Sequence, residues 1–370
     1  MTINDICQHF DLKGDYVSCK EIKTGNINST YLVRFVYGNE KRNYILQRIN
    51  KHVFRNPERV MQNILSVTEY VRSSKKKMGL PTHNTALHVY KTTADDKPIF
   101  MDNFGDYWRC YRYVENSFTF DSTNDLNVIE EVGKAFGAFQ NALDGYPAKS
   151  LYISIPHFHD TPKRYERFER FVKADKVGRK KEVESEIERI LSFKETASIL
   201  QNMLDAGKLP LRVTHNDTKC NNVSFDRDTN KSLAVLDLDT VMPGAIAFDF
   251  GDAVRSIAST KEEDDPDIKN VLLDLDKYRA FSKGFVTEVK DKLTENEKST
   301  LNLGVFTLTV ELAMRFLGDY LNGDKYFKID YPWHNLDRAR NQLALAEDIL
   351  VKKTEMDAIL KELLRSSDNG

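Results

Sequence analysis

The sequence carries little net charge and lacks the marks of an exported or membrane-bound chain. Its 54 lysines and arginines nearly balance 56 aspartates and glutamates, so the formal net charge is −2. Such a chain has no broad positive field for nucleic acid or for an anionic membrane surface. It starts without a basic segment and an apolar run, and no stretch approaches the ~20 consecutive apolar residues of a membrane span. We therefore expect a cytoplasmic protein that binds neither nucleic acid nor membrane.

Cysteine is also scarce. The four cysteines are widely spaced and form no C-x-x-C pair, which argues against both a disulfide framework and a zinc site. The segment "HFHDTP" places His157 and His159 two residues apart, a spacing for which metal binding has to be considered. Because no third nitrogen or sulfur ligand is nearby, we prefer a structural role for both histidines.

The N-terminal third has the pattern of strands and one long helix. The run "YLVRFVYGNEKRNYILQRI" contains two β-rich segments around Gly38-Asn39, which predicts a hairpin. Further on, Asn56 and Pro57 precede apolar residues at helical spacing and so predict a capped helix start. Residues 86–115 return to strand character in two runs, "ALHVYKTT" and "YWRCYRYV".

Helical periodicity dominates after about residue 120, with one exception at residues 209–240. There the apolar runs "LPLRV" and "SLAVLDLD" enclose a polar segment, which predicts a loop between strands. At 370 residues the chain exceeds a typical single domain. We predict an α+β fold with a β-rich N-terminal lobe, residues 1–113, and a mainly helical C-terminal lobe, residues 114–370.

The polar loop, "THNDTKCNN" at residues 214–222, combines residue types that phosphoryl transfer requires. That reaction needs a carboxylate near the acceptor hydroxyl, oxygen ligands for Mg²⁺, and positive charge near the phosphoryl group. Asp217 can supply the carboxylate and Lys219 the charge, whereas His215 would brace the loop. Asn222 and Asp237 can supply the oxygens that Mg²⁺ prefers.

An Asn/Asp-rich loop is, however, most often a turn whose side chains bond to its own backbone. The motif H-x-D-x-x-x-x-N alone would leave the two interpretations about equal. The second acidic motif, "VLDLDT" after an apolar strand, favours catalysis. Asp239 would share one side of an extended strand with Asp237, as a second metal contact or a structural acceptor. Downstream, "FDFGD" offers Asp249 and Asp252 as braces for the loop.

With these motifs in place, the chain resembles the aminoglycoside phosphotransferase-like branch of the protein-kinase-like fold, and within it the N-acetylhexosamine 1-kinases. The similarity runs over nearly the whole length through segments in family order: "GNINSTYLV", "YILQRIN", "HFHDTP", "LRVTHNDTKCNN", "LDLDTVMPG", "FDFGD" and "MRFLGDYLNGDKYF". The resemblance implies a bilobal kinase-like fold with ATP between the lobes, and we expect a monomer.

The resemblance also implies roles for individual residues. Asp217 matches the catalytic aspartate, and Asn222 and Asp237 match the Mg²⁺ ligands. The hinge, whose backbone would bind adenine, corresponds to four consecutive residues: Arg112, Tyr113, Val114 and Glu115. Arg315 and Tyr326 match positions that look toward the sugar.

Other interpretations of these two acceptor-side residues stay open. Arg315 could form a helix-surface ion pair with Glu311 or Asp319, each four residues away. Its neighbours belong to the apolar face, however, which favours a partly buried and directed arginine. Tyr326 could equally be a packing residue, although sugars favour aromatic faces.

Two positions depart from the family pattern. Gln47 occupies the strand position where many kinases keep a lysine for the ATP phosphates. The loop "TGNINST" has one glycine, so phosphate contacts would come from backbone N–H groups and the hydroxyls of Ser29 or Thr30. In the same loop, Asn26 replaces a histidine of the sugar kinases, which keeps a hydrogen-bonding group but could shift the sugar preference.

The sequence therefore predicts an ATP- and Mg²⁺-dependent kinase for the anomeric hydroxyl of N-acetylglucosamine or N-acetylgalactosamine. The nearest rival is a kinase for another small alcohol, such as homoserine, choline or an aminoglycoside. Cationic acceptors of that kind would call for several carboxylates or an aromatic cage. A third possibility, suggested by Gln47, is a nucleotide-binding protein without catalytic activity.

Overall fold

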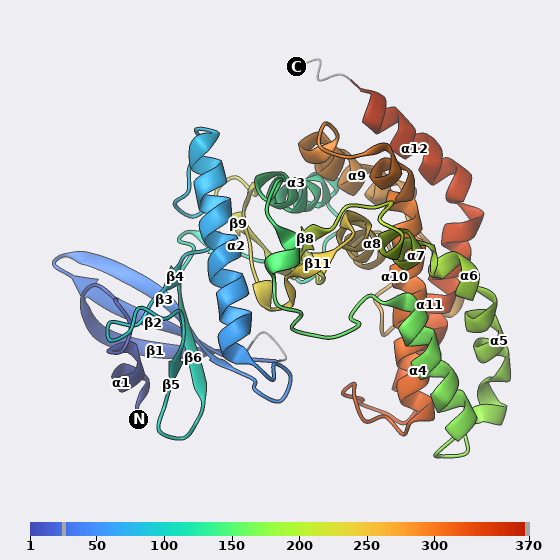
Figure 1. Ribbon diagram of the computed structural model, residues 1–370, viewed down its shortest axis with the longest axis horizontal. Helices are drawn as coiled ribbons and strands as arrows, with labels where there is room; N and C mark the ends of the chain where they lie inside the picture. Colours follow the sequence, from blue (N-terminus) through green and yellow to red (C-terminus); the bar gives the residue numbers. More distant parts are fainter. Residues whose placement is uncertain (24–26, 367–370) are drawn as a thin grey trace. The chain divides into compact units, whose positions relative to one another are not determined.

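The structure, a computed structural model, describes residues 1–23 and 27–366, which fall into two compact units (Figure 1). The first unit comprises residues 1–119, 145–155 and 223–242, and the second comprises residues 120–144, 156–222 and 243–370. The units are thus discontinuous in sequence, whereas the sequence suggested a single boundary at residues 113/114. Two segments of the predicted C-terminal lobe, residues 145–155 and 223–242, group with the N-terminal strands.

The first unit is built on an antiparallel sheet with strand order β1-β2-β3-β6-β4, in which β5 also pairs with β6. A second sheet has the order β10-β9-β7. The elements of this unit are α1 (Ile3–Cys7), β1 (Asp15–Ile22), β2 (Ser29–Tyr37), β3 (Glu40–Ile49), α2 (Pro57–Lys77), β4 (Val89–Tyr90), β5 (Phe100–Met101), β6 (Tyr107–Arg112), β7 (Ser117–Phe118), η1 (Ala148–Ser150), β9 (Val223–Asp226), β10 (Ser232–Val235) and η4 (Leu238–Thr240).

The local signals read from the sequence of this unit are confirmed. Strands β2 and β3 form a hairpin around Gly38, which has φ 61°, a conformation that glycine adopts without a steric cost. Helix α2 begins at Pro57, and the Asn56 side chain caps it by accepting the backbone N–H of Arg59. One face of the sheet packs with α1 into an apolar core: Ile6, Cys7, Phe10, Val33, Phe35, Tyr44, Leu46, Trp108 and Cys110.

The second unit is mainly helical, as expected (Figure 1). Its elements are α3 (Leu126–Ala142), α4 (Thr161–Ala174), η2 (Lys180–Val183), α5 (Glu184–Ser192), α6 (Lys194–Ala197), α7 (Ile199–Asp205), β8 (Arg212–Thr214), η3 (Cys220–Asn222), α8 (Ile246–Ile257), η5 (Ile268–Asn270), α9 (Leu275–Val289), α10 (Glu295–Leu321), α11 (His334–Val351) and α12 (Lys353–Arg365). The strand β11 (Met242–Gly244) begins at the last residue of the first unit.

Helix α10 is the central element of the second unit. Contrary to the expectation from sequence, this helix of 27 residues is long enough and apolar enough to cross a membrane, by its length and composition alone. However, 83% of the apolar window is buried inside the protein. The apolar side chains of α10 therefore pack against neighbouring helices, which is the pattern of a core helix.

Helix α8 lies close against α10 because glycines remove side chains at the crossing. A Cβ atom on Gly251 would collide with the backbone of Gly304, and one on Gly304 would collide with the carbonyl oxygen of Ala247. This close packing fixes α8, which carries Asp249 and Asp252. The position of both carboxylates is thus set by backbone-to-backbone contact between two buried helices.

Candidate active site

The loop after β8 holds Asp217 in a defined orientation. Asn222 donates through Nδ2 to the main-chain oxygen of Asp217 at 2.8 Å and to its carboxylate at 3.0 Å. His215 is fully buried, accepts the backbone N–H of Asp217 at Nδ1, and packs edge-on against Phe136. The role of His215 as a brace, predicted from sequence, is confirmed. Asn216 adopts φ 65° and so shapes the turn before Asp217.

Two buried carboxylates on α8 anchor the same loop. Asp249 accepts the backbone N–H groups of His215 at 2.9 Å and Asn216 at 2.8 Å, and Gln140 Nε2 at 2.7 Å. Asp252 accepts the backbone N–H of Thr218 at 3.0 Å. These two side chains confirm the sequence-based interpretation of "FDFGD" as a brace, because together they fix the backbone on both sides of Asp217.

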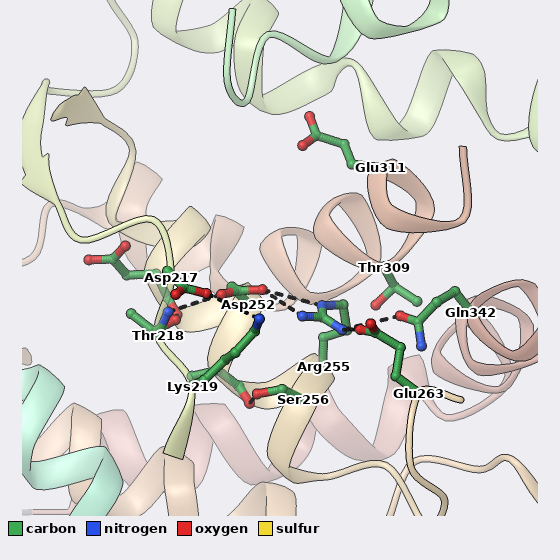
Figure 2. Close-up of polar contacts among 12 residues, drawn as sticks. Asp217, Thr218, Lys219, Asp252, Arg255, Ser256, Glu263, Thr309, Glu311 and Gln342 are labelled. Atoms are coloured by element: carbon green, nitrogen blue, oxygen red, sulfur yellow. Dashed lines mark hydrogen bonds and ion pairs between the residues drawn. The ribbon is translucent and has the colours of Figure 1, made fainter. Parts of the chain in front are cut away.

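Charges around the loop form a connected network (Figure 2). Lys219 Nζ lies 3.4 Å from Asp217 Oδ1, and this carboxylate raises the pKa of Lys219. Burial alone would raise the pKa of Asp252, but the Arg255 and Lys219 cations outweigh it and lower that pKa below its ordinary value. Arg255 also binds Glu263 at 2.9 Å. Burial raises the pKa of Asp249, and the interactions with His215, Asn216 and Gln140 oppose this only in part.

A cavity of about 390 Å³ opens in the second unit beside this loop. Lys219 and Asn221 line it from the loop, and Arg255 lines it from α8. Its wall also carries two exposed carboxylates, Asp121 and Glu262, for which no hydrogen bond or ion pair occurs within residues 27–366. The remaining wall is rich in hydroxyl and amide groups: Ser122, Thr123, Asn124, Ser256, Ser259, Thr260 and Gln342.

In the first unit, the chain turns sharply at Asp237 instead of continuing as a strand. Strand β10 ends at Val235, Asp237 has φ 53° and ψ 67°, and Leu238–Thr240 is a 3₁₀ turn. The expectation that Asp237 and Asp239 share one side of an extended strand is therefore wrong. Of the two roles considered for Asp239, the structure shows a structural acceptor, since Asn28 Nδ2 donates to it at 2.7 Å and Arg109 binds both of its carboxylate oxygens.

Arg109 is the residue that sequence reasoning missed. It lies on β6 directly opposite Gln47 of β3, and it is only 1% exposed. Its Nε donates to Gln47 Oε1 at 2.9 Å, and its guanidinium pairs with Asp239. Burial would lower the pKa of Arg109, but the Asp239 carboxylate raises it above the ordinary value. The buried cation at this position of the sheet thus comes from β6, next to the glutamine that replaces the usual lysine.

The other predicted nucleotide-side residues lie on β2, β3 and β6. Gln47 Nε2 donates to the Thr30 hydroxyl at 2.9 Å, and Arg48, on the opposite face, donates to the Ser29 hydroxyl at 3.3 Å. Both hydroxyls predicted to contact phosphate therefore have partners on β3. Asn26 lies outside the described residues.

The predicted hinge follows the end of β6. Arg112 is the last residue of the strand and donates its backbone N–H to His88. The Ser117 hydroxyl donates to the carbonyl oxygen of Val114 at 2.6 Å, and Asn43 Nδ2 donates to the Glu115 carboxylate at 3.1 Å. Tyr113 N–H contacts the carbonyl of Asn43 at the longer distance of 3.4 Å.

Arg315 and Tyr326 lie together in the second unit. The Arg315 guanidinium carbon is 5.7 Å from the Tyr326 ring centroid, 5.2 Å from that of Phe327 and 6.0 Å from that of Phe158. The ion pair with Glu311 or Asp319 that the sequence allowed does not form. Asp319 instead accepts backbone N–H groups of the loop that carries Tyr326. Arg315 is therefore a half-buried cation held by aromatic faces.

The two histidines of "HFHDTP" have different partners. His157 is largely exposed and faces Asp160 at 2.7 Å, whereas His159 Nδ1 faces the buried Glu311 at 2.8 Å. Glu311 also accepts the Thr161 hydroxyl at 2.7 Å and pairs with Arg164 at 3.3 Å. Burial would raise the pKa of Glu311, but Arg164 and His159 lower it below its ordinary value. The carboxylate of Glu311 is thus ionised and acts as an acceptor.

Comparison with known proteins identifies the family. The model of the phosphotransferase enzyme family matches residues 18–281, about 70% of the chain, including every loop carboxylate described above. The chain belongs to this phosphotransferase family. Membership implies that phosphate is transferred from ATP, with a divalent metal, to an alcohol acceptor.

Solved structures with the same fold support this assignment at the level of architecture. A microcompartment-associated aminopropanol kinase aligns with TM-score 0.64 at 16% identity, over 96% of this chain and 97% of that one. Choline kinase from Cryptosporidium parvum aligns with TM-score 0.55 at 13% identity, over 98% and 99%. A spectinomycin phosphotransferase aligns with TM-score 0.54 at 13% identity, over 93% and 94%. The expected protein-kinase-like α+β fold is confirmed.

The two predicted metal ligands of this chain, Asn222 and Asp237, offer oxygen atoms of the kind that magnesium prefers. Asn222 uses its amide nitrogen to hold Asp217, and its amide oxygen has no hydrogen bond within the described ranges. That oxygen, in the second unit, and the Asp237 carboxylate, in the first unit, are each a hard ligand of the kind that Mg²⁺ takes. A bound Mg²⁺ would supply charge neutralisation at the phosphates.

Proposed function

We propose that the chain transfers the γ-phosphoryl group of ATP to the anomeric hydroxyl of N-acetylglucosamine or N-acetylgalactosamine. In this proposal Asp217 accepts or orients the hydroxyl proton, and Lys219 offsets charge on the phosphoryl group. Asn222 and Asp237 hold Mg²⁺. An anomeric hydroxyl is more acidic than an ordinary alcohol, so a carboxylate of modest basicity is sufficient as the base.

The observation that carries the phosphotransfer part is the support around Asp217. Three different side chains, Asn222, Asp249 and Asp252, hold the loop on both sides of this carboxylate. A carboxylate that is half-exposed while its backbone is fully braced suits a positioned base better than a simple polar turn. The same bracing argues against a protein that only binds nucleotide.

The sugar part rests on the acceptor-side residues and on the resemblance of the chain to the N-acetylhexosamine 1-kinases. Within the part of the chain that the structure describes, no carboxylate pairs with Arg315, which is unfavourable for a cationic acceptor but compatible with hydroxyl or carbonyl oxygens. Tyr326 is 68% exposed and stands beside it, where an aromatic face can stack on a sugar ring.

A second candidate is a kinase for an amino alcohol. It is favoured by Asp121 and Glu262, two exposed carboxylates among those in the wall of the cavity beside Lys219, since an ammonium group pairs with carboxylates. The aminopropanol and choline kinases that share the fold act on acceptors of this kind by their names. The two candidates differ in which residue recognises the acceptor.

Release of ADP, measured over N-acetylhexosamines, plain hexoses and amino alcohols, separates these candidates. We expect turnover with N-acetylhexosamines, and a loss of about 10²-fold to 10⁴-fold in Asp217→Asn. A matched control, Asp205→Asn, changes an exposed carboxylate at the end of α7 and should keep full activity. Turnover with amino alcohols alone would favour the second candidate, and ATP binding without any turnover would contradict both.

A further inference from the structure

His159 has one ring nitrogen with a strong partner and one without any. Its side chain is 9% exposed, and Nδ1 lies 2.8 Å from Glu311 Oε2. Nε2 is buried and has no hydrogen-bond partner in the described ranges. An unpaired buried polar atom is costly, typically by about 1–3 kcal/mol, so buried nitrogens of this kind normally have partners. The lack of a hydrogen-bond partner for Nε2 among the described residues therefore needs an explanation.

The partner at Nδ1 determines what Nε2 can do. Glu311 is ionised and offers only acceptor oxygens, so Nδ1 must carry a proton and donate it. In a neutral imidazole with Nδ1 protonated, Nε2 has a lone pair and acts as an acceptor. Thr161 and Arg164 hold the Glu311 carboxylate in place. The Glu311–His159 pair therefore holds Nε2 in a fixed direction as a hydrogen-bond acceptor.

The surroundings of His159 connect it to the active-site loop. Its ring packs against Phe248 at 5.0 Å between centroids, one helical turn before Asp252 on α8. Asp252, on the same helix, accepts the backbone N–H of Thr218 beside Asp217. Glu311 lies on α10, and in Figure 2 no dashed line joins it to the network around Asp217 and Asp252.

The residue before His159 joins it to the predicted sugar-side arginine. The Phe158 ring is 4.6 Å from the His159 ring, and the same Phe158 ring lies under the Arg315 guanidinium. The elements that carry these residues all belong to the second unit. His159 thus packs against Phe248 on α8, the helix that braces the loop, and against Phe158, which contacts Arg315.

We propose that Nε2 of His159, oriented by Glu311, accepts a hydrogen bond from a hydroxyl group of the acceptor other than the one that is phosphorylated. This inference rests on the proposed function, because it assigns a specificity-determining contact within the same site. It involves no proton transfer. An acceptor molecule that lacks this second hydroxyl leaves Nε2 without a hydrogen bond and binds more weakly.

Two substitutions separate the roles of the two ring nitrogens. In His159→Asn the amide nitrogen can still donate to Glu311, as Nδ1 does, but nothing remains at the position of Nε2. In His159→Gln the longer side chain returns a polar group to the Nε2 position. His157→Asn is a matched control in the same segment, where φ 58° suits asparagine.

We expect His159→Asn to raise the acceptor KM by about threefold to tenfold, the effect of one lost neutral hydrogen bond. The KM for ATP should stay within about twofold, while the Tm falls in His159→Asn because the ring contacts with Phe158 and Phe248 are lost. His159→Gln should recover part of the loss in acceptor KM, and His157→Asn should match the wild type. An unchanged acceptor KM in His159→Asn, or an equal loss of affinity for ATP, would overturn the proposal in favour of a purely structural role.

A spectroscopic measurement does not depend on turnover. In wild-type protein with ¹⁵N-labelled histidine, the His159 Nε2 resonance, assigned by its absence in His159→Asn, should move to lower frequency when the acceptor is added. A resonance that is already in its hydrogen-bonded position and does not respond shows a water partner and refutes the proposal. If no compound in the panel is phosphorylated, the proposed function fails, and this titration against the same compounds still decides the role of His159.

Discussion

Replacement of Arg109 by methionine should strongly destabilise the first unit. The substitution removes the guanidinium that binds both oxygens of Asp239, which is 4% exposed, and it removes the donor to Gln47. Asp239 then keeps Asn28 as its remaining donor among the contacts described above. Breaking a buried ion pair from one side typically costs about 3–5 kcal/mol, because the other charge stays buried without compensation.

A double-mutant cycle gives the sharper test. Asp239→Asn removes the opposite charge, so the double variant Arg109→Met/Asp239→Asn should lose about 1–3 kcal/mol less than the sum of the two single losses. Additive effects, or a loss below about 1 kcal/mol in Arg109→Met, would show that the pair is not coupled as the structure indicates.

The chain offers a convenient reporter for this cycle. Of its two tryptophans, Trp108 is buried in the core of the first unit beside Arg109, and Trp333 is 57% exposed on the second unit. In a Trp333→Phe background, urea unfolding followed by tryptophan fluorescence therefore reports the first unit alone.

Three further outcomes follow from contacts elsewhere. The pKa of Glu311 is lower in the folded protein than in the unfolded chain, so ionised Glu311 stabilises the fold above the unfolded-state pKa, and this stabilisation is lost as the pH falls through the folded-state pKa. Glu311→Gln should therefore flatten the acid side of a plot of Tm against pH. An unchanged acid side would count against this. Gly304→Ala should lower stability by about 1–3 kcal/mol, since its Cβ meets the backbone of α8, and a wild-type Tm would contradict this packing. Burial raises the pKa of Cys220 to about 12, so a thiol reagent at pH 8 should label the exposed Cys19 first, and equal labelling by mass spectrometry would disagree with the structure.

Local signals in the sequence were sufficient for much of the first unit and for the catalytic loop. The Gly38 turn, the Asn56 cap and the helical spacing after residue 120 each depend on neighbouring residues, and each was read correctly. The braces Asp249 and Asp252 were predicted because they follow the loop in a known family order. A missed strand, β9, had a readable signal as well, since "DRDTN", which begins at its last residue, Asp226, is a turn sequence.

Contacts between distant parts of the sequence could not be read in this way. Arg109 sits in the alternating run "YWRCYRYV", where an arginine is expected to face solvent, and its partner Asp239 comes 130 residues later. The one available signal was Gln47, a missing cation whose cross-strand neighbour on β6 is Arg109. The turn at Asp237 was also missed, because a left-handed aspartate leaves no mark in an apolar run that reads as a continuing strand.

The most direct test of the central claim is ³¹P NMR of the reaction of the wild-type protein with Mg²⁺-ATP and N-acetylglucosamine or N-acetylgalactosamine. The account predicts that ADP and a sugar 1-phosphate appear together, with the new phosphorus resonance split by the anomeric proton, and that Asp217→Asn abolishes both. ATP that stays intact with both sugars, or a phosphate ester that forms only with an amino alcohol, would contradict it.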